Sequence, residues 1–140
     1  MDKDSPDLCY ALAARKNDRH LSRLYDSHLA PVGLSVSQFS ILTLLSAKGP
    51  LKTADLADLL VMERTSLVRA LKPLQSAGWI ATQSAAEGRG HELALTAAGR
   101  KKTAAALPLW RAAQRAFEAE VGRARAIRQR DESLQLHAGR

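Results

Sequence analysis

Two short helical patterns and a glycine-rich hairpin pattern follow one another in residues 53–95, TADLADLLVMERTSLVRALKPLQSAGWIATQSAAEGRGHELAL. The leucines of the first half recur at helical spacing, which predicts two short helices in succession. The residues expected to face the core are Leu56, Leu59 and Leu60 in the first helix and Leu67, Leu71 and Leu74 in the second. Thr53 is expected to cap the first helix, and Gly78 to end the second in a left-handed conformation.

The hydrophobic period changes from helical to alternating after Gly78. Residues 79–82 and 91–95 read as two short strands, and residues 85–90 supply the glycines of a hairpin tip. A helix pair followed by a basic hairpin is the order of a winged helix-turn-helix, in which the second helix enters the DNA major groove and the hairpin lies beside it. The fold class is therefore expected to be mainly α with a small β-hairpin.

Further helices are predicted on both sides of this core. Apolar residues at helical spacing predict a long helix over about residues 6–30, which ends before Pro31. Ser35 and Gln38 form a capping-box pattern, which opens a helix that stops at Gly49. The chain is helical in pattern again after residue 96.

The C-terminal third contains two irregularities. Pro108 is expected to kink the alanine-rich helix that follows Thr96, because proline lacks a backbone N–H. Residues 122–140 hold few apolar side chains, so this tail is expected to be weakly ordered or helical only with a partner. The tail carries Arg123, Arg125, Arg128 and Arg130.

Composition favours one basic domain with a polyanionic partner. The 140 residues are 46% hydrophobic, enough for a single buried core, and the formal net charge is +7. Positive charge suits nucleic acid but does not by itself separate DNA from RNA or an anionic membrane. The start of the chain lacks the features of a secretory signal, and no segment has the apolar length of a membrane span. We therefore expect a cytoplasmic protein with no membrane partner.

The second short helix carries the expected major-groove contacts. If its leucines face the core, five polar residues are left to face outward, namely Arg64, Thr65, Ser66, Arg69 and Lys72. Arginine pairs bidentately with guanine, and serine or threonine contacts bases or phosphates, so the set contains both base readers and phosphate anchors. An ordinary solvated helix face is an equal alternative on composition alone.

The hairpin tip presents a second cation. Arg89 is flanked by Gly88 and Gly90, and a narrow minor groove attracts such a cation on a loop that approaches the DNA backbone closely. The alternative is a flexible surface turn whose arginine is only solvated.

Taken together, these motifs resemble the MarR family of bacterial transcription factors over about residues 8–117. The resemblance rests on residues 64–71, Leu74, residues 78–80, the tip at 87–89, and residues 93–96 followed by Gly99. The family usually has an aspartate two residues before the arginine of the tip. Here Glu87 replaces that aspartate, and Arg89 keeps the position of the family's minor-groove arginine.

The resemblance implies a homodimer that binds double-stranded DNA at a pseudo-palindromic operator, often as a repressor released by a small-molecule effector or an oxidant. It divides one domain, residues 1–140, into a winged core at 34–96 and dimerisation helices at 1–33 and 97–140. The expected dimer contacts are Leu8, Leu12, Leu107, Trp110 and Phe117. Pro73 departs from a regular recognition helix and is expected to kink it beyond Lys72.

Cys9 raises the question of redox sensing. Some relatives that sense organic hydroperoxides carry a reactive cysteine near the start of the first helix, and Cys9 lies in that neighbourhood. Neither Tyr10 nor Tyr25 clearly reproduces the hydroxyl arrangement of such a sensor. We therefore favour a buried cysteine that acts as a small hydrophobe, and keep a thiol-based hydroperoxide-sensing repressor as the alternative.

Catalytic and metal-binding patterns are not found in the sequence. The chain has four histidines, at His20, His28, His91 and His137. They show no metal-ligand spacing with one another or with Cys9. No nucleophile motif or phosphate-binding glycine loop occurs. We expect no enzyme activity, cofactor or metal. A winged-helix protein-interaction module is a further alternative, but it would not need cations at both groove-facing places, which hold Arg64, Arg69 and Arg89.

Overall fold

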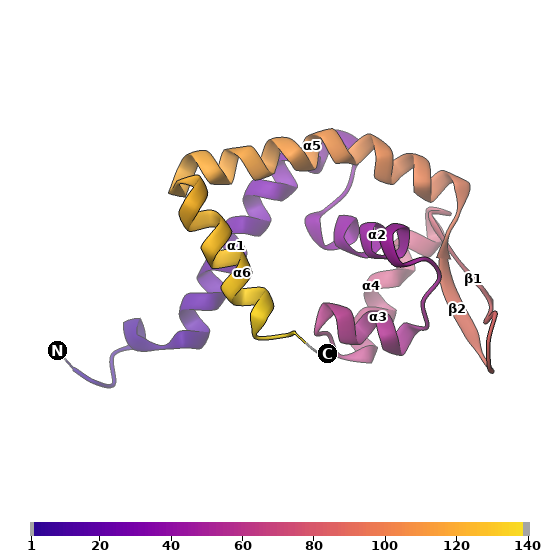
Figure 1. Cartoon of the computed structure of the whole chain (residues 1–140), viewed down its shortest axis with the longest axis horizontal. Helices are drawn as coiled ribbons and strands as arrows, with labels where there is room; N and C mark the ends of the chain where they lie inside the picture. Colours follow the sequence, from indigo (N-terminus) through magenta and orange to yellow (C-terminus); the bar gives the residue numbers. More distant parts are fainter. Residues whose placement is uncertain (1, 139–140) are drawn as a thin grey trace.

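The computed structural model describes residues 2–138, which form mostly α-helices and one two-stranded antiparallel hairpin. The elements are η1 (Pro6–Leu8), α1 (Tyr10–Leu29), η2 (Ala30–Val32), α2 (Val36–Lys48), α3 (Thr53–Leu60), α4 (Arg64–Ser76), β1 (Ile80–Ser84), β2 (His91–Leu95), α5 (Ala97–Val121) and α6 (Arg123–Gln135). Figure 1 shows α5 spanning the molecule, with α1 and α6 at one end and α2, α3, α4 and the hairpin at the other. The mainly α fold with a small hairpin is confirmed.

The winged part of the fold is built around leucines. Leu42, Leu56, Leu67 and Leu74 are fully buried side chains from three successive helices. The predicted capping box opens α2, because the Ser35 hydroxyl accepts from the Gln38 N–H at 3.1 Å and the Gln38 side chain accepts from the Ser35 N–H at 3.0 Å. The buried leucines pack α3 and α4 against α2.

Backbone hydrogen bonds pair the two strands of the hairpin and attach it to the segment before α3. β1 and β2 pair from Ile80 opposite Leu95 to Ser84 opposite His91. Leu93 also exchanges two backbone hydrogen bonds with Leu51, at 3.0 and 2.7 Å, in the segment that precedes α3. The pairing at Leu93, in the middle of β2, therefore anchors the hairpin to the winged core, and Gly88 at the tip lies near the Lys52 side chain.

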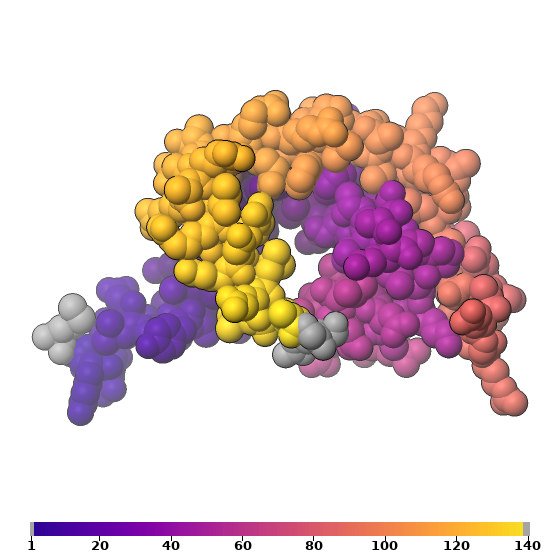
Figure 2. Space-filling view, in the orientation of Figure 1, coloured from indigo at the N-terminus to yellow at the C-terminus, as the bar shows by residue number. Residues whose placement is uncertain are grey.

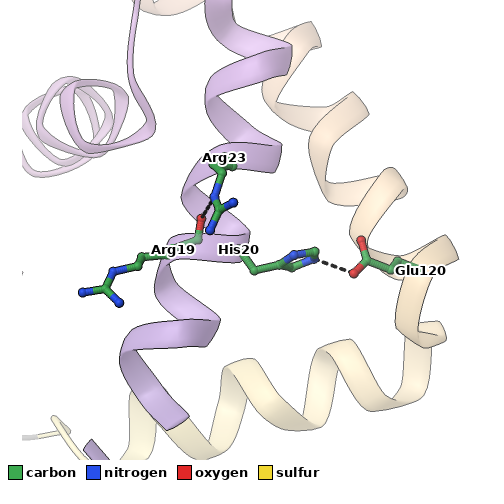
Figure 3. A network of polar contacts seen from close by, with 4 residues as sticks. All are labelled: Arg19, His20, Arg23 and Glu120. Carbon is green, nitrogen blue, oxygen red and sulfur yellow. Dashed lines mark hydrogen bonds and ion pairs between the residues drawn. The ribbon is translucent and has the colours of Figure 1, made fainter. Parts of the chain in front are cut away.

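The long helices α1 and α5 pack against each other. His20 Nε2 in α1 lies 2.5 Å from Glu120 Oε1 near the end of α5, and the Arg23 guanidinium on α1 donates to the Arg19 carbonyl at 3.4 Å (Figure 3). The Tyr25 hydroxyl of α1 donates to the Gln114 side chain of α5. Polar pairs therefore join α1 and α5 at two levels.

Both prolines lie within continuous helices, so neither ends its helix, and the kinks expected at them stay predictions. α4 runs through Pro73, and α5 runs through Pro108. Each proline is exposed, and so is the residue four positions earlier, whose carbonyl lost its partner. Water can satisfy those carbonyls, so the missing N–H does not end either helix.

The C-terminal tail differs from expectation because α6 forms within the single chain. Gly122, with φ of 92°, separates it from α5, and Arg123 Nε donates to Glu118 Oε2 at 3.1 Å across that break. Ala126 is buried. A short apolar contact and one ion pair therefore suffice to seat this helix. The last two residues of the predicted tail lie outside the described residues.

Three smaller expectations at helix ends are corrected. The first helix begins at Tyr10 rather than near residue 6, because the turn before it is the 3₁₀ segment η1. Thr53 is the first residue of α3, and the N-cap is Lys52, which makes no side-chain cap hydrogen bond. Leu59 is exposed rather than inward.

No single helix in residues 2–138 is long and apolar enough to cross a membrane. The consecutive segments Tyr10–Val32 and Val36–Lys48 reach that length and apolarity only as a pair, and they are bent by 73° relative to each other.

Candidate nucleic-acid interface

A tight turn joins α3 to α4. Val61 adopts a left-handed conformation with φ of 54°, which is costly for a β-branched residue. Its N–H donates to the Asp58 carbonyl at 3.1 Å, and the Met62 N–H donates to the Ala57 carbonyl at 2.9 Å. These bonds and the buried face of α3 hold the turn, so the start of α4 has a fixed direction.

The outward face of α4 is basic and free of acidic residues. Leu67, Leu71 and Leu74 are buried, and the five predicted contact residues are all exposed: Arg64, Thr65, Ser66, Arg69 and Lys72. Among the described residues, none of these five side chains takes part in a hydrogen bond or an ion pair with the rest of the chain. The helix therefore presents donors and positive charge to solvent.

Val68 lies on the same outward face and was missed by the sequence reasoning. Its side chain is 46% exposed, and it lies one turn from Arg64 and next to Arg69. An exposed apolar side chain among cations is suited to contact a thymine methyl group in the major groove. The sequence offers one signal of this exposure, because Val68 directly follows Leu67, which is predicted to face the core.

The hairpin tip supports Arg89 on a glycine-shaped loop. Gly88 and Gly90 have φ of 77° and 95°, and the Ala85 N–H donates to the Gly90 carbonyl at 3.0 Å, which closes the loop. Arg89 is exposed and forms no ion pair with any described carboxylate, including Glu87 two residues before it. The tip therefore carries a free cation away from the core, as expected of a wing.

A pocket of about 610 Å³ lies between α1, α2, α5 and α6. Its walls include Leu21, Phe117 and Ile127, and polar groups at its surface include Tyr25 and Arg130. Figure 2 shows the molecule hollowed between α6, in yellow, and the core helices, in magenta. The volume is in the range of small-molecule sites.

The polar end of this pocket contains a perturbed tyrosine. Burial, with a smaller contribution from the negative charge of Glu118, raises the pKa of the Tyr25 phenol above its ordinary value. Tyr25 is therefore a neutral hydroxyl at physiological pH, held in place by its bond to Gln114.

Cys9 differs from the buried residue that we expected. Its side chain is exposed, and its sulfur accepts a hydrogen bond from the Leu12 N–H at 3.3 Å, so that it caps the start of α1. In residues 2–138 no group of three or more histidine, cysteine or acidic side chains is placed to hold a metal ion.

Comparison with known proteins connects this geometry to a family. The family model described as "MarR family" matches residues 34–87, which begin just before α2 and end in the hairpin tip. The crystal structure of the M. tuberculosis transcriptional regulator MosR is 32% identical, covers 96% of this chain and 98% of its own, and has a TM-score of 0.79. MosR in complex with DNA is 31% identical, covers 93% of this chain and 98% of its own, and has a TM-score of 0.75.

A more distant structure shares the fold. The transcriptional repressor CouR bound to p-coumaroyl-CoA is 23% identical, covers 94% of each chain and has a TM-score of 0.81. No curated protein matches this chain at a significant level by sequence.

Proposed function

The chain belongs to the MarR family of transcriptional regulators, and we propose that it is a sequence-specific repressor that binds a pseudo-palindromic operator in double-stranded DNA. The observation that carries this proposal is the outward face of α4, where Arg64, Arg69 and Lys72 are exposed beside a buried leucine stripe with no acidic residue in the helix. A repressor acts where the DNA is, so we assign the protein to the cytoplasm. The family relatives are regulators, and we propose no enzymatic reaction.

We assign different tasks to the two exposed elements. Arg69, on the middle of α4, reads a base edge in the major groove, and Arg64, Thr65, Ser66 and Lys72 anchor phosphates or contact neighbouring bases. Arg89 enters the adjacent minor groove from the wing, where the base pattern is degenerate and charge matters most. The existence of a MosR–DNA complex supports DNA binding by this fold.

Genomic SELEX followed by footprinting tests DNA binding directly. Wild-type protein is expected to enrich a pseudo-palindromic site and to protect it, and a variant with Arg64, Arg69 and Arg89 all changed to alanine is expected to do neither. The matched control changes three exposed arginines of α5 and α6, Arg111, Arg115 and Arg125, and so removes the same charge. Failure of the wild type to enrich any sequence would overturn the proposal in favour of a protein-interaction module.

The homodimer is proposed to form through the terminal helices, residues 1–33 and 97–140, around the winged core at 34–96. Four of the seven exposed large apolar side chains in residues 2–138 lie toward the two ends of the chain, where Leu8 is 46% exposed, Tyr10 93%, Leu134 63% and Leu136 79%. Burial of such side chains favours association. Sedimentation velocity at micromolar concentration is expected to give a dimer, and a monomer would contradict this part of the proposal.

Trp110, one of the expected dimer contacts, is only partly buried within the single chain. Its ring stacks on Phe39 of the same chain, with centroids 6.2 Å apart and planes at 29°, and Leu107 also packs on the chain's own core. Phe117 lines the pocket. These three side chains keep part of their surface exposed, so they stay proposed dimer contacts beside the more exposed side chains near the termini.

Release from DNA is proposed to follow binding of a small aromatic effector in the pocket between α1, α2, α5 and α6. CouR, which has the same fold, binds p-coumaroyl-CoA. The test titrates p-coumarate and p-coumaroyl-CoA into the protein–operator complex while fluorescence anisotropy follows the DNA. Release in the wild type and its loss in Ser40→Phe, which narrows the pocket from α2, are expected. If neither compound releases DNA, this choice of effector class is wrong while operator binding stands.

A thiol-based sensor is the second candidate, favoured by the exposure of Cys9 at the start of α1. An accessible thiol can be oxidised to a sulfenic acid. We expect Cys9→Ser to bind the operator as the wild type does, because the thiol serves as a helix cap. If hydroperoxide releases the wild type from DNA but not Cys9→Ser, the sensor role replaces this interpretation.

A further inference from the structure

The first turn of α5 lies directly on the backbone that follows α4. Thr96 Oγ1 donates to the Gly78 carbonyl at 2.6 Å, and the Thr96 N–H donates to the Trp79 carbonyl at 3.1 Å. A Cβ atom on Gly99 would lie 2.1 Å from the Trp79 carbonyl oxygen, so only glycine permits this approach. The end of α4 and the start of α5 are therefore fastened together.

Lys102 extends this junction by one turn of α5. Its ammonium lies 4.9 Å from the centroid of the Trp79 ring and donates to the Val32 carbonyl at 2.9 Å. Trp79 follows α4, and Val32 ends the η2 turn after α1. A single side chain therefore joins three segments that are distant in sequence.

The surroundings of Lys102 are unusual for a cation in this protein. Its side chain is half-buried, whereas every other lysine and arginine in residues 2–138 is exposed. No described carboxylate forms an ion pair with it. A carbonyl dipole and an indole face hold the charge instead, and both interactions strengthen when water is partly excluded.

We propose that Lys102 is a positioning residue for DNA recognition, which transmits the position of α1 and η2 to the end of α4 and the base of the wing. The proposal rests on the proposed DNA-binding function. α1 lines the pocket, so a shift of α1 moves Val32 relative to Trp79. Lys102 links these two residues and thereby links the pocket wall to the DNA-reading helix.

The experiment compares Lys102→Met with Lys101→Met. Lys101 precedes Lys102 on the same helix and is exposed. Its change to methionine removes the same charge. Lys102→Met is expected to weaken operator binding roughly five- to tenfold, about the size of one lost cation–π contact. Lys101→Met is expected to stay within about twofold of the wild type. Lys102→Arg should recover most of the loss, because a guanidinium can also stack on indole and donate.

Salt dependence separates positioning from direct DNA contact. A phosphate contact would lower the slope of log affinity against log salt by about one when the cation is removed. We expect Lys102→Met to lose affinity with an unchanged slope. Equal affinities of Lys102→Met and Lys101→Met, or a slope that falls with the affinity in Lys102→Met, would overturn the proposal.

A DNA-independent measurement keeps this inference separate from the proposed function. Tryptophan emission of the folded protein is expected to change in Lys102→Met and not in Lys101→Met, because the ammonium lies over Trp79. Unchanged emission in Lys102→Met overturns the contact itself. If the wild type binds no duplex, the proposed function fails and the role of Lys102 in recognition fails with it, whereas a changed emission in Lys102→Met would still establish the contact with Trp79. Lys102→Gln, which keeps a donor without charge, serves if Lys102→Met does not fold.

Discussion

Arginine is abundant both in the winged part and in α6, yet its surroundings differ between the two. On α4 and the wing, Arg64, Arg69 and Arg89 are exposed, and no acidic residue occurs within α4. In α6, by contrast, Arg123 Nε lies 3.1 Å from Glu118 and Arg130 Nε lies 2.8 Å from Asp131. Arginine in α6 is therefore partly neutralised within the chain, while arginine on α4 is free to meet phosphate or guanine.

The comparison indicates that arginine content alone does not identify a DNA-binding face. Favourable association with DNA comes from cations that replace condensed counterions, and a cation already paired with a carboxylate must first lose that partner. Direction also matters, because the buried stripe of Leu67, Leu71 and Leu74 fixes which side of α4 is presented. The comparison predicts that substitutions of arginine on α4 and the wing have large effects on DNA binding, and that substitutions of arginine in α6 have small effects.

Arg69→Ala is expected to have the largest effect. The loss of a base contact in the major groove should cost about 1–3 kcal/mol on the best operator and should narrow the gap between matched and mismatched sites. Anisotropy titrations on both kinds of duplex measure this effect. A uniform loss on every sequence would assign Arg69 to a phosphate and would break the division between its role and that of Arg89.

Arg89→Ala is expected to act more broadly. Removal of the wing cation should weaken binding to many sequences and lower the salt slope by about one unit, because one neutralised phosphate or minor-groove site is lost. Arg89→Lys keeps the charge and should retain most of the slope. Wild-type binding by Arg89→Ala would mean that the wing does not touch DNA.

The order of elements could be predicted from the sequence because local signals decide it. The capping box of Ser35 and Gln38, the glycine after α4 and the alternation in residues 91–95 all act within a few residues. The same locality let the outward residues of α4 be predicted from the leucine period. Exposure of those residues is confirmed, and their contact with DNA stays a proposal.

Features that depend on distant residues could not be predicted in the same way. Whether Pro73 and Pro108 break a helix depends on which side faces water, and that is settled by packing. The contact of Lys102 with Trp79 and Val32 joins segments that carry no shared sequence pattern. The seating of α6 likewise rests on Glu118, which lies in the preceding helix.

Tyr25→Phe tests a polar contact between the long helices α1 and α5. Polar groups there are expected to stabilise the fold rather than bind DNA. Loss of the bond to Gln114 should lower the free energy of unfolding by about 1 kcal/mol at neutral pH, with operator affinity unchanged. Urea unfolding measures the first quantity and anisotropy the second.

The alkaline pH dependence of Tyr25→Phe has a definite sign. Because the pKa of Tyr25 is raised in the folded state, its contribution to stability is present below the unfolded pKa, about 10, and is lost as pH rises through the folded value. The wild type should therefore lose stability more steeply than Tyr25→Phe above about pH 10. Parallel curves for the two proteins would remove Tyr25 as the titrating group.

Arg125→Ala is expected to have the smallest effect, and it tests the comparison most severely. Arg125 is exposed and forms no ion pair among the described residues, so within α6 it is a cation in surroundings like those of Arg69. Arg125 and Arg69 differ in where they lie in the molecule (Figure 1).

The 25 residues of α5 put the start of α6 roughly 37 Å from the base of the hairpin. This distance is several times the Debye length, which is about 8–10 Å at physiological salt. Operator affinity should therefore stay within about twofold of the wild type, with the same salt slope. A loss of affinity with a lower slope would mean that α6 meets DNA in the assembled protein, and free arginine rather than its position on α4 would then define the interface.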